Sequence, residues 1–156
     1  MAQLTLTFPY RSPPGLRKAK DLDDIPLYPL LNIKLYTERH KPINFEGLLD
    51  SGADGLFLPK QIAEGLGLPK IKRIKTSGIL KSAMCYRTNV GFIVGATKTR
   101  CIDFGIIDAA FPETESDIPI LIGRDPIFKF FEVTFKEYKE RPKIMLTQKK
   151  ALPNKA

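Results

Sequence analysis

The sequence contains little of the material that several common kinds of site require. Among 156 residues there are two cysteines, one histidine and no tryptophan. Cys85 and Cys101 are too few for a disulfide framework in a chain of this size. With His40 as the single histidine, metal ligation by histidines and catalysis by a Ser or Cys nucleophile with a histidine base are both disfavoured. We therefore expect neither a metal nor a cofactor.

Long apolar runs are also missing. No run approaches the ~20 residues that a helix needs to cross a bilayer. The first residues, MAQLTLTFPYRS, lack the basic start and the apolar stretch of a signal peptide. We therefore expect a cytoplasmic protein that does not enter a membrane. The length, with 43% hydrophobic and 27% charged residues, is typical of one globular domain.

Acidic residues are fewer than basic ones, with 17 Asp and Glu against 25 Lys and Arg, which gives a net charge of +8. Such an excess can indicate nucleic-acid binding. Here the basic residues are scattered over several segments, and no aromatic residues are interleaved with them. We interpret the charge as an aid to solubility and rank nucleic-acid binding lowest. We expect a domain over residues 1–148 and a disordered basic tail over residues 149–156.

What the sequence does contain is a succession of short strand patterns. The most continuous apolar run, IPILIG at 118–123, predicts a buried central strand. Only two short helices are expected, one beginning near Pro59 and one near Pro126. Many short strands with brief helices predict a β-barrel or a β-sandwich. The other expected extended segments are 4–10, 27–37, 43–50, two around Ser77–Gly78, 99–109, and a hairpin around 139–142.

The triplet Asp50-Ser51-Gly52 interrupts an apolar stretch, because FEGLL precedes it and ADGLFLP follows it. The carboxylate is therefore expected on a stiff loop between buried segments. One aspartate alone hydrolyses amides poorly, but two carboxylates sharing a proton can act together as base and acid. The chain has one copy of the triplet, and a two-fold homodimer would supply the second. Ser51 offers a hydroxyl to bond across the axis, and Gly52 permits a tight turn and close approach.

Three segments in this order resemble the retropepsin-like aspartic proteases, which are single-domain, homodimeric relatives of pepsin. They are LLDSGADGLFLP, GIL at Gly78, and ILIGRDPIFKFFEVTF, and the match runs roughly over residues 27–146. The resemblance implies an all-β closed barrel with short helices, one lobe per chain, acting as a homodimer. It also implies an aspartic endopeptidase whose substrate is a peptide or an unfolded protein. A preference for apolar side chains is expected if Leu56, Ile79 and Leu80 line its pockets, although each could instead belong to the core.

The same resemblance assigns roles to the residues of the first and last segments. Asp50 would be the catalytic aspartate, and Ser51 would join the hydroxyl network across the dimer axis. Gly52 and Ala53 would line the cleft and contact the substrate backbone. Arg124 would form an ion pair with Asp54 and tie the catalytic loop to the start of the helix.

Between these segments the family carries a hairpin flap over the substrate. TSGILKSA, residues 76–83, lies in the expected interval, so Thr76, Ser77, Gly78 and Ile79 would bind substrate. Flap tips in the family are richer in glycine than this segment, whose single glycine is Gly78. An ordinary turn at Gly78 is an equally good interpretation of that segment.

Two questions stay open at this point. The first is whether the chain is a protease or a catalytically silent dimerisation or binding module that keeps this fold. Contact between the two Asp50 carboxylates through one water would favour the protease. The second question is the dimer interface. The segments 4–10 and 143–148 could interleave between subunits, or each could be closed within its own subunit.

Overall fold

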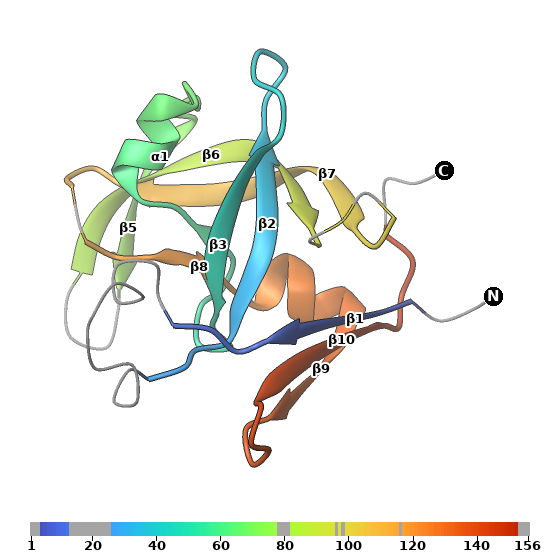
Figure 1. Ribbon diagram of the computed structural model, residues 1–156. Helices are drawn as coiled ribbons and strands as arrows, with labels where there is room; N and C mark the ends of the chain where they lie inside the picture. The colour runs from blue at the N-terminus through green and yellow to red at the C-terminus, as the bar shows by residue number, and fades with distance from the viewer. Residues whose placement is uncertain are drawn as a thin grey trace.

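A computed structural model describes residues 4–12, 26–77, 82–95, 97, 99–115 and 117–152. Strands joined by short turns form most of the described chain (Figure 1). The elements are β1 (Thr5–Pro9), β2 (Leu30–Tyr36), β3 (Ile43–Leu49), β4 (Leu56–Phe57), α1 (Lys60–Gly65), β5 (Lys72–Ser77), β6 (Ser82–Val94), β7 (Ile102–Pro112), β8 (Ile120–Ile122), the helical segment η2 (Arg124–Phe128), β9 (Phe131–Lys136) and β10 (Lys143–Gln148).

Six strands form a closed barrel. They follow the order β2-β3-β8-β4-β7-β6, and pairing of β2 with β6 closes the ring, while β5 extends the sheet beyond β6. Alternation along the strands fills the interior, since Leu31, Ile33 and Leu35 of β2 are buried and the residues between them are only half-buried. The expectation of a mostly β closed barrel with short helices is therefore confirmed.

The strand β8 lies at the centre of the barrel wall, as its apolar sequence predicted. It pairs in parallel with β3 and antiparallel with β4, and its residues Ile120 and Ile122 are buried. Because β3 and β8 are parallel, both strands end at the same edge of the sheet. This arrangement brings the loop that follows β3 next to the helical segment that follows β8.

A second sheet is formed by the two ends of the chain. Its order is β1-β10-β9, and all pairings are antiparallel. Both candidate interface segments are therefore closed within one subunit. After β10 the Lys149 amide bonds to the Phe130 carbonyl at 2.8 Å, and Leu152 is buried in the core. Residues 153–156 lie outside the described residues.

Tyr36 marks the seam where β2 closes on β6. Its hydroxyl donates to Asp103 Oδ1 at 2.8 Å, and its ring lies over Gly91, where a Cβ would be 2.3 Å from the ring. Burial, and then the hydrogen bond to Asp103, raises the pKa of Tyr36 to about 12. Burial and a hydrogen bond to Glu137 likewise raise the pKa of Tyr10 to about 12.

These two tyrosines predict a loss of stability at alkaline pH. Their pKa in the folded state exceeds the value of about 10 for an unfolded chain. The stabilisation that comes from this difference is therefore fully present below about pH 10 and is lost above it. The free energy of unfolding should then fall as the pH rises from about 10 to about 12. Denaturant titrations across this range should show a shallower fall for the double variant Tyr10→Phe/Tyr36→Phe. If the free energy of unfolding fell as steeply with pH in that variant as in the natural chain, the two tyrosines would not be the cause.

Within the part of the chain that the structure describes, no helix combines the length and the apolar character needed to cross a membrane.

Candidate active site

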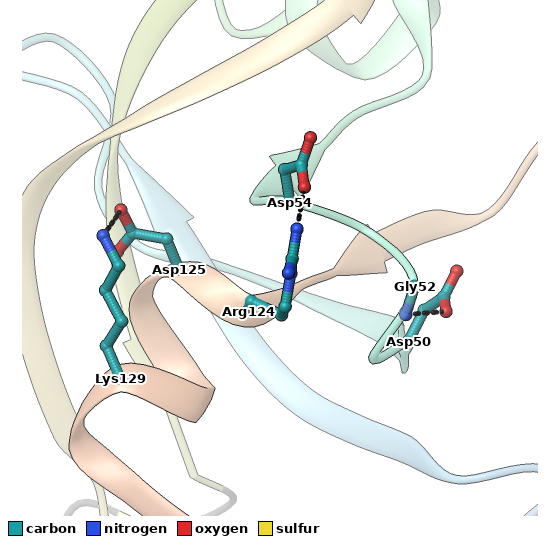
Figure 2. A network of polar contacts seen from close by, with 6 residues as sticks. All are labelled: Asp50, Gly52, Asp54, Arg124, Asp125 and Lys129. Atoms are coloured by element: carbon teal, nitrogen blue, oxygen red, sulfur yellow. Dashed lines mark hydrogen bonds and ion pairs between the residues drawn. The ribbon is translucent and has the colours of Figure 1, made fainter. Parts of the chain in front are cut away.

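Asp50 lies directly after β3 on a tight loop. Its amide donates to the Ile122 carbonyl of β8 at 2.9 Å, which continues the parallel pairing by one residue. Its Oδ1 accepts a hydrogen bond from the Gly52 amide at 2.8 Å, and its carbonyl accepts one from the Ala53 amide at 3.2 Å. The loop therefore turns around the carboxylate of its own first residue. In Figure 2 the other carboxylate oxygen is directed away from Gly52.

Main-chain hydrogen bonds join this loop to the segment after β8. The Arg124 amide donates to the Ala53 carbonyl, and the Asp125 amide donates to the Asp54 carbonyl, both at 2.9 Å. Gly123 makes this approach possible, because a Cβ there would lie 2.4 Å from the Ala53 oxygen. The end of β8 thus holds the start of the loop, and the segment after β8 holds its middle. These main-chain bonds were not evident from the sequence.

The ion pair expected from the sequence is present, since the Arg124 guanidinium donates to the Asp54 carboxylate (Figure 2). Both side chains are exposed, at 61% for Arg124 and 92% for Asp54. A second exposed pair joins Lys129 Nζ to Asp125 Oδ2 at 3.1 Å. Exposed pairs contribute little to stability because solvent screens them. The main-chain bonds therefore hold the loop more firmly than the guanidinium does.

Arg124→Gln is accordingly expected to lower the free energy of unfolding by less than about 1 kcal/mol. The substitution removes the ion pair and leaves the Arg124 amide bond to Ala53 intact. Chemical denaturation of Arg124→Gln, Asp54→Asn and the double variant isolates the pair energy as a double-mutant cycle. A loss of several kcal/mol for the single change would show that the side chain, not the main chain, is the principal tether.

A cleft of about 740 Å³ lies beside the loop. Phe57 of β4 stands between Leu121 of β8 and Ala110 of β7 in the strand register, so these three residues form one row across the sheet. Ile74 and Thr76, two residues apart on β5, line the cleft from that strand. The full lining is Gly52, Ala53, Asp54, Gly55, Leu56, Phe57, Ile74, Thr76, Ile106, Ile107, Asp108, Ala109, Ala110, Leu121, Asp125 and Pro126.

Several of the residues singled out in the sequence meet at this cleft, namely Gly52, Ala53, Asp54 and Thr76. Ser51 is exposed on the loop and is not part of the lining, and Ser77 ends β5. Gly78 and Ile79 lie outside the described residues. Sequence reasoning missed the row of Leu121, Phe57 and Ala110, because only the strand register places those residues together.

A second hollow, of about 860 Å³, opens between β2, β3 and α1, with Tyr28, Leu48, Ile62 and Ile120 among its lining residues. Among its described lining residues, Glu46 supplies the carboxylate, and Arg11 forms an ion pair with it at 2.8 Å. The carboxylate of the larger hollow is thus already paired with a cation. The smaller cleft borders the loop of Asp50 through Gly52, Ala53, Asp54 and Gly55, and Asp50 itself is not among its lining residues.

A comparison with solved structures finds the same architecture in a retropepsin-like aspartic protease from Rickettsia conorii. The TM-score is 0.52, the sequence identity is 16%, and the match covers 95% of each chain. The fold is retropepsin-like. No protein-family model and no curated protein matches the sequence. At this identity the similarity establishes the retropepsin-like fold and leaves the activity to be argued from the site.

Proposed function

We propose that the protein is an aspartic endopeptidase that acts as a homodimer, with a water held between Asp50 and the partner's Asp50. The observation that carries the proposal is the placement of Asp50. It follows β3 on a loop held by main-chain bonds to Ile122 and Arg124, and the loop borders a largely apolar cleft in a retropepsin-like fold.

In this reaction one carboxyl of the pair is ionised and the other is protonated. The ionised carboxylate takes a proton from the water as its oxygen attacks the carbonyl carbon of the peptide. The protonated carboxyl donates its proton to the carbonyl oxygen, which gives a tetrahedral gem-diol. The carboxyl that took the proton from the water then gives it to the amide nitrogen, and the C–N bond breaks. At the same time one hydroxyl of the gem-diol gives its proton to the other carboxylate and becomes the new carbonyl oxygen. The products are a carboxylic acid and an amine, and the pair again holds one proton.

The neighbouring residues would support this pair. Ser51 would donate a hydrogen bond across the axis, and its exposure leaves its hydroxyl accessible to a partner. Gly52 and Ala53 line the cleft and would contact the substrate backbone. Asp54 and Arg124 would hold the far end of the loop.

The flap would close over the substrate from β5 and β6. Thr76 lies on the cleft side of β5, and Ser77, Gly78 and Ile79 follow it in the sequence. The row of Leu121, Phe57 and Ala110 gives the cleft an apolar floor. Apolar side chains in an extended peptide or an unfolded protein are therefore the expected substrates.

A binding module without catalysis is the second candidate. The larger hollow between β2, β3 and α1 favours it, because that hollow does not include Asp50 or its loop. Such a module would keep the fold and bind a partner at a site remote from Asp50.

Cleavage of an unfolded protein, followed from about pH 3 to about pH 8, tests the proposal. Material shown to be dimeric should cleave with a bell-shaped pH profile, because the pair must hold one proton. Asp50→Asn, prepared in the same way, should not cleave. An absence of cleavage by the dimeric natural chain at every pH would reject the protease and favour the binding module.

A further inference from the structure

The three-stranded sheet at the chain ends leaves open the question of how two copies meet. Its central strand, β10, is covered by β1 on one side and by β9 on the other. Interleaving of terminal strands would require displacing one of these neighbours. Within the described sheet, no further strand pairs with the outer side of β1 or with the outer side of β9. The choice between them rests on the proposed function, because an Asp50 dyad is incomplete without a second copy.

The hydrogen-bond pattern fixes which groups of β1 point outward. The Tyr10 amide donates to Pro142 and the Gln148 amide donates to the Leu4 carbonyl, both at 2.9 Å, so even-numbered residues of β1 face β10. Since main-chain groups alternate in direction along a strand, Thr5, Thr7 and Pro9 direct theirs outward.

Arg11, the next residue in the outward series, confirms this direction. It exchanges hydrogen bonds with Tyr28 at 3.1 and 2.9 Å, so the outer edge is already paired at that point. Pro9 has no N–H to offer. The complete outward donor and acceptor pairs on β1 therefore belong to Thr5 and Thr7.

Charge separates the two edges. No charged residue occurs between Leu4 and Tyr10, although 27% of the chain is charged. The strand β9 carries Glu132 and Lys136. A strand that pairs with its own copy in a two-fold dimer meets its own side chains, and charges on an edge strand oppose such pairing. The strand β1 itself is therefore better suited to a second copy than β9 is, and the charge near it comes from Arg100, which borders a hollow of about 180 Å³ together with Leu6, Thr7 and Phe8.

The outer edge of β1 also leads toward the catalytic loop. Arg11 pairs with Tyr28, and the next residue, Pro29, accepts a hydrogen bond at 3.0 Å from the amide of Leu49, which precedes Asp50. Figure 1 shows β1 passing across the end of the barrel where β3 finishes. A two-fold axis beside β1 can therefore also pass beside Asp50.

We propose that a second copy pairs antiparallel along the outer edge of β1 and joins the two three-stranded sheets into one continuous sheet. The register centred on Leu6 places Thr5 opposite Thr7 of the partner subunit. Each of the two symmetry-related pairs then exchanges both of its main-chain hydrogen bonds, and the threonine side chains face each other across the strands. The pairing between the two copies ends before Arg11, because the main-chain groups of Arg11 already bond to Tyr28.

Thr7→Pro tests this edge because it removes one outward N–H and leaves the bonds from β1 to β10 in place. Phe135→Pro is the matched control. The Lys149 amide bonds to the Phe130 carbonyl, so Phe135 directs its main-chain groups outward from β9, and its side chain is 41% exposed. Sedimentation velocity over a concentration series should show the dimer of Thr7→Pro weakened at least about tenfold. Phe135→Pro should dimerise like the natural chain.

A charge swap at Thr5, which is half-buried, and Thr7, which is exposed, tests the register. Thr7→Glu alone should weaken the dimer, and Thr5→Lys/Thr7→Glu should restore it, since each introduced lysine would face an introduced glutamate of the other copy.

The outcomes separate this interface from the proposed activity. Unweakened dimers of Thr7→Pro and Thr7→Glu, or an equal loss in Phe135→Pro, would overturn the interface even if the natural chain cleaves protein. Weakening specific to β1, in a natural dimer that cleaves nothing, would support the interface and reject the protease. A natural chain that is monomeric at every concentration would overturn both.

Discussion

Asp50→Asn is expected to reduce the rate of peptide-bond cleavage by about a thousandfold or more while the chain keeps its fold. An amide cannot take a proton from the water or share a proton with the partner's carboxyl. Its carbonyl oxygen can still accept the hydrogen bond that Gly52 donates to Asp50 Oδ1. The loop geometry should therefore survive the change, and the loss should be one of chemistry.

The matched control for this change is Asp117→Asn. Asp117 is exposed, precedes β8 in the sequence and is not among the lining residues of the cleft. The same exchange of carboxylate for amide there should leave the rate within about twofold of the natural chain. Equal losses in both variants would mean that the assay reports stability or net charge, not the dyad.

Mixing the two kinds of subunit tests whether the dyad spans two chains. A tenfold excess of the Asp50→Asn chain should lower the activity of the natural chain about tenfold once subunits exchange, because most natural chains would then sit in mixed dimers. Each mixed dimer has a single catalytic carboxylate. Undiminished activity in the mixture, with exchange demonstrated, would mean that one chain is sufficient for catalysis and would contradict the proposed mechanism.

The parts of this site that could be predicted from the sequence are those with a local signal. The triplet at Asp50 stands out because polar residues interrupt an apolar stretch, and the apolar run before Gly123 predicts the buried strand beside it. Arg124 and Asp54 were paired through the resemblance of the two motifs, and the structure contains that pair.

The parts that could not be predicted depend on strand register and chain closure. Phe57 meets Ala110 and Leu121 because three strands from separate regions align, and none of these residues carries a polar signal of its own. The pairing of β1 with β10 joins the two ends of the chain, and an alternating strand pattern does not specify its partner. The same limit applies to the choice between interleaved and closed terminal strands.

Gly123→Ala is expected to be among the most damaging single-methyl additions in the chain. A Cβ at this position would lie 2.4 Å from the Ala53 oxygen and 2.7 Å from both the Ala53 carbonyl carbon and the Gly55 oxygen. All three are main-chain atoms of the loop, so no side-chain rotation can relieve the overlap. The backbone at Gly123 is extended, with φ of −101°, so the cost comes from the contact and not from the dihedral angle.

Chemical denaturation should show the free energy of unfolding of Gly123→Ala reduced by about 1–3 kcal/mol or more. Gly65→Ala, at the end of α1, is the matched control, because no atom lies within 4 Å of its added Cβ. That change should stabilise the chain by up to about 1 kcal/mol. Equal stabilities for the two variants would contradict the close packing of the loop on Gly123.

The activity of Gly123→Ala then tells whether Asp50 depends on that packing. If the loop moves away from Arg124, the two carboxylates of a dimer lose their matched positions, and cleavage should fall even at temperatures where the variant is fully folded. Unchanged cleavage in a destabilised but folded variant would show that the bond from Asp50 to Ile122 is sufficient to place the carboxylate. In that case the main-chain tether between Ala53 and Arg124 would serve the stability of the barrel edge and not the chemistry.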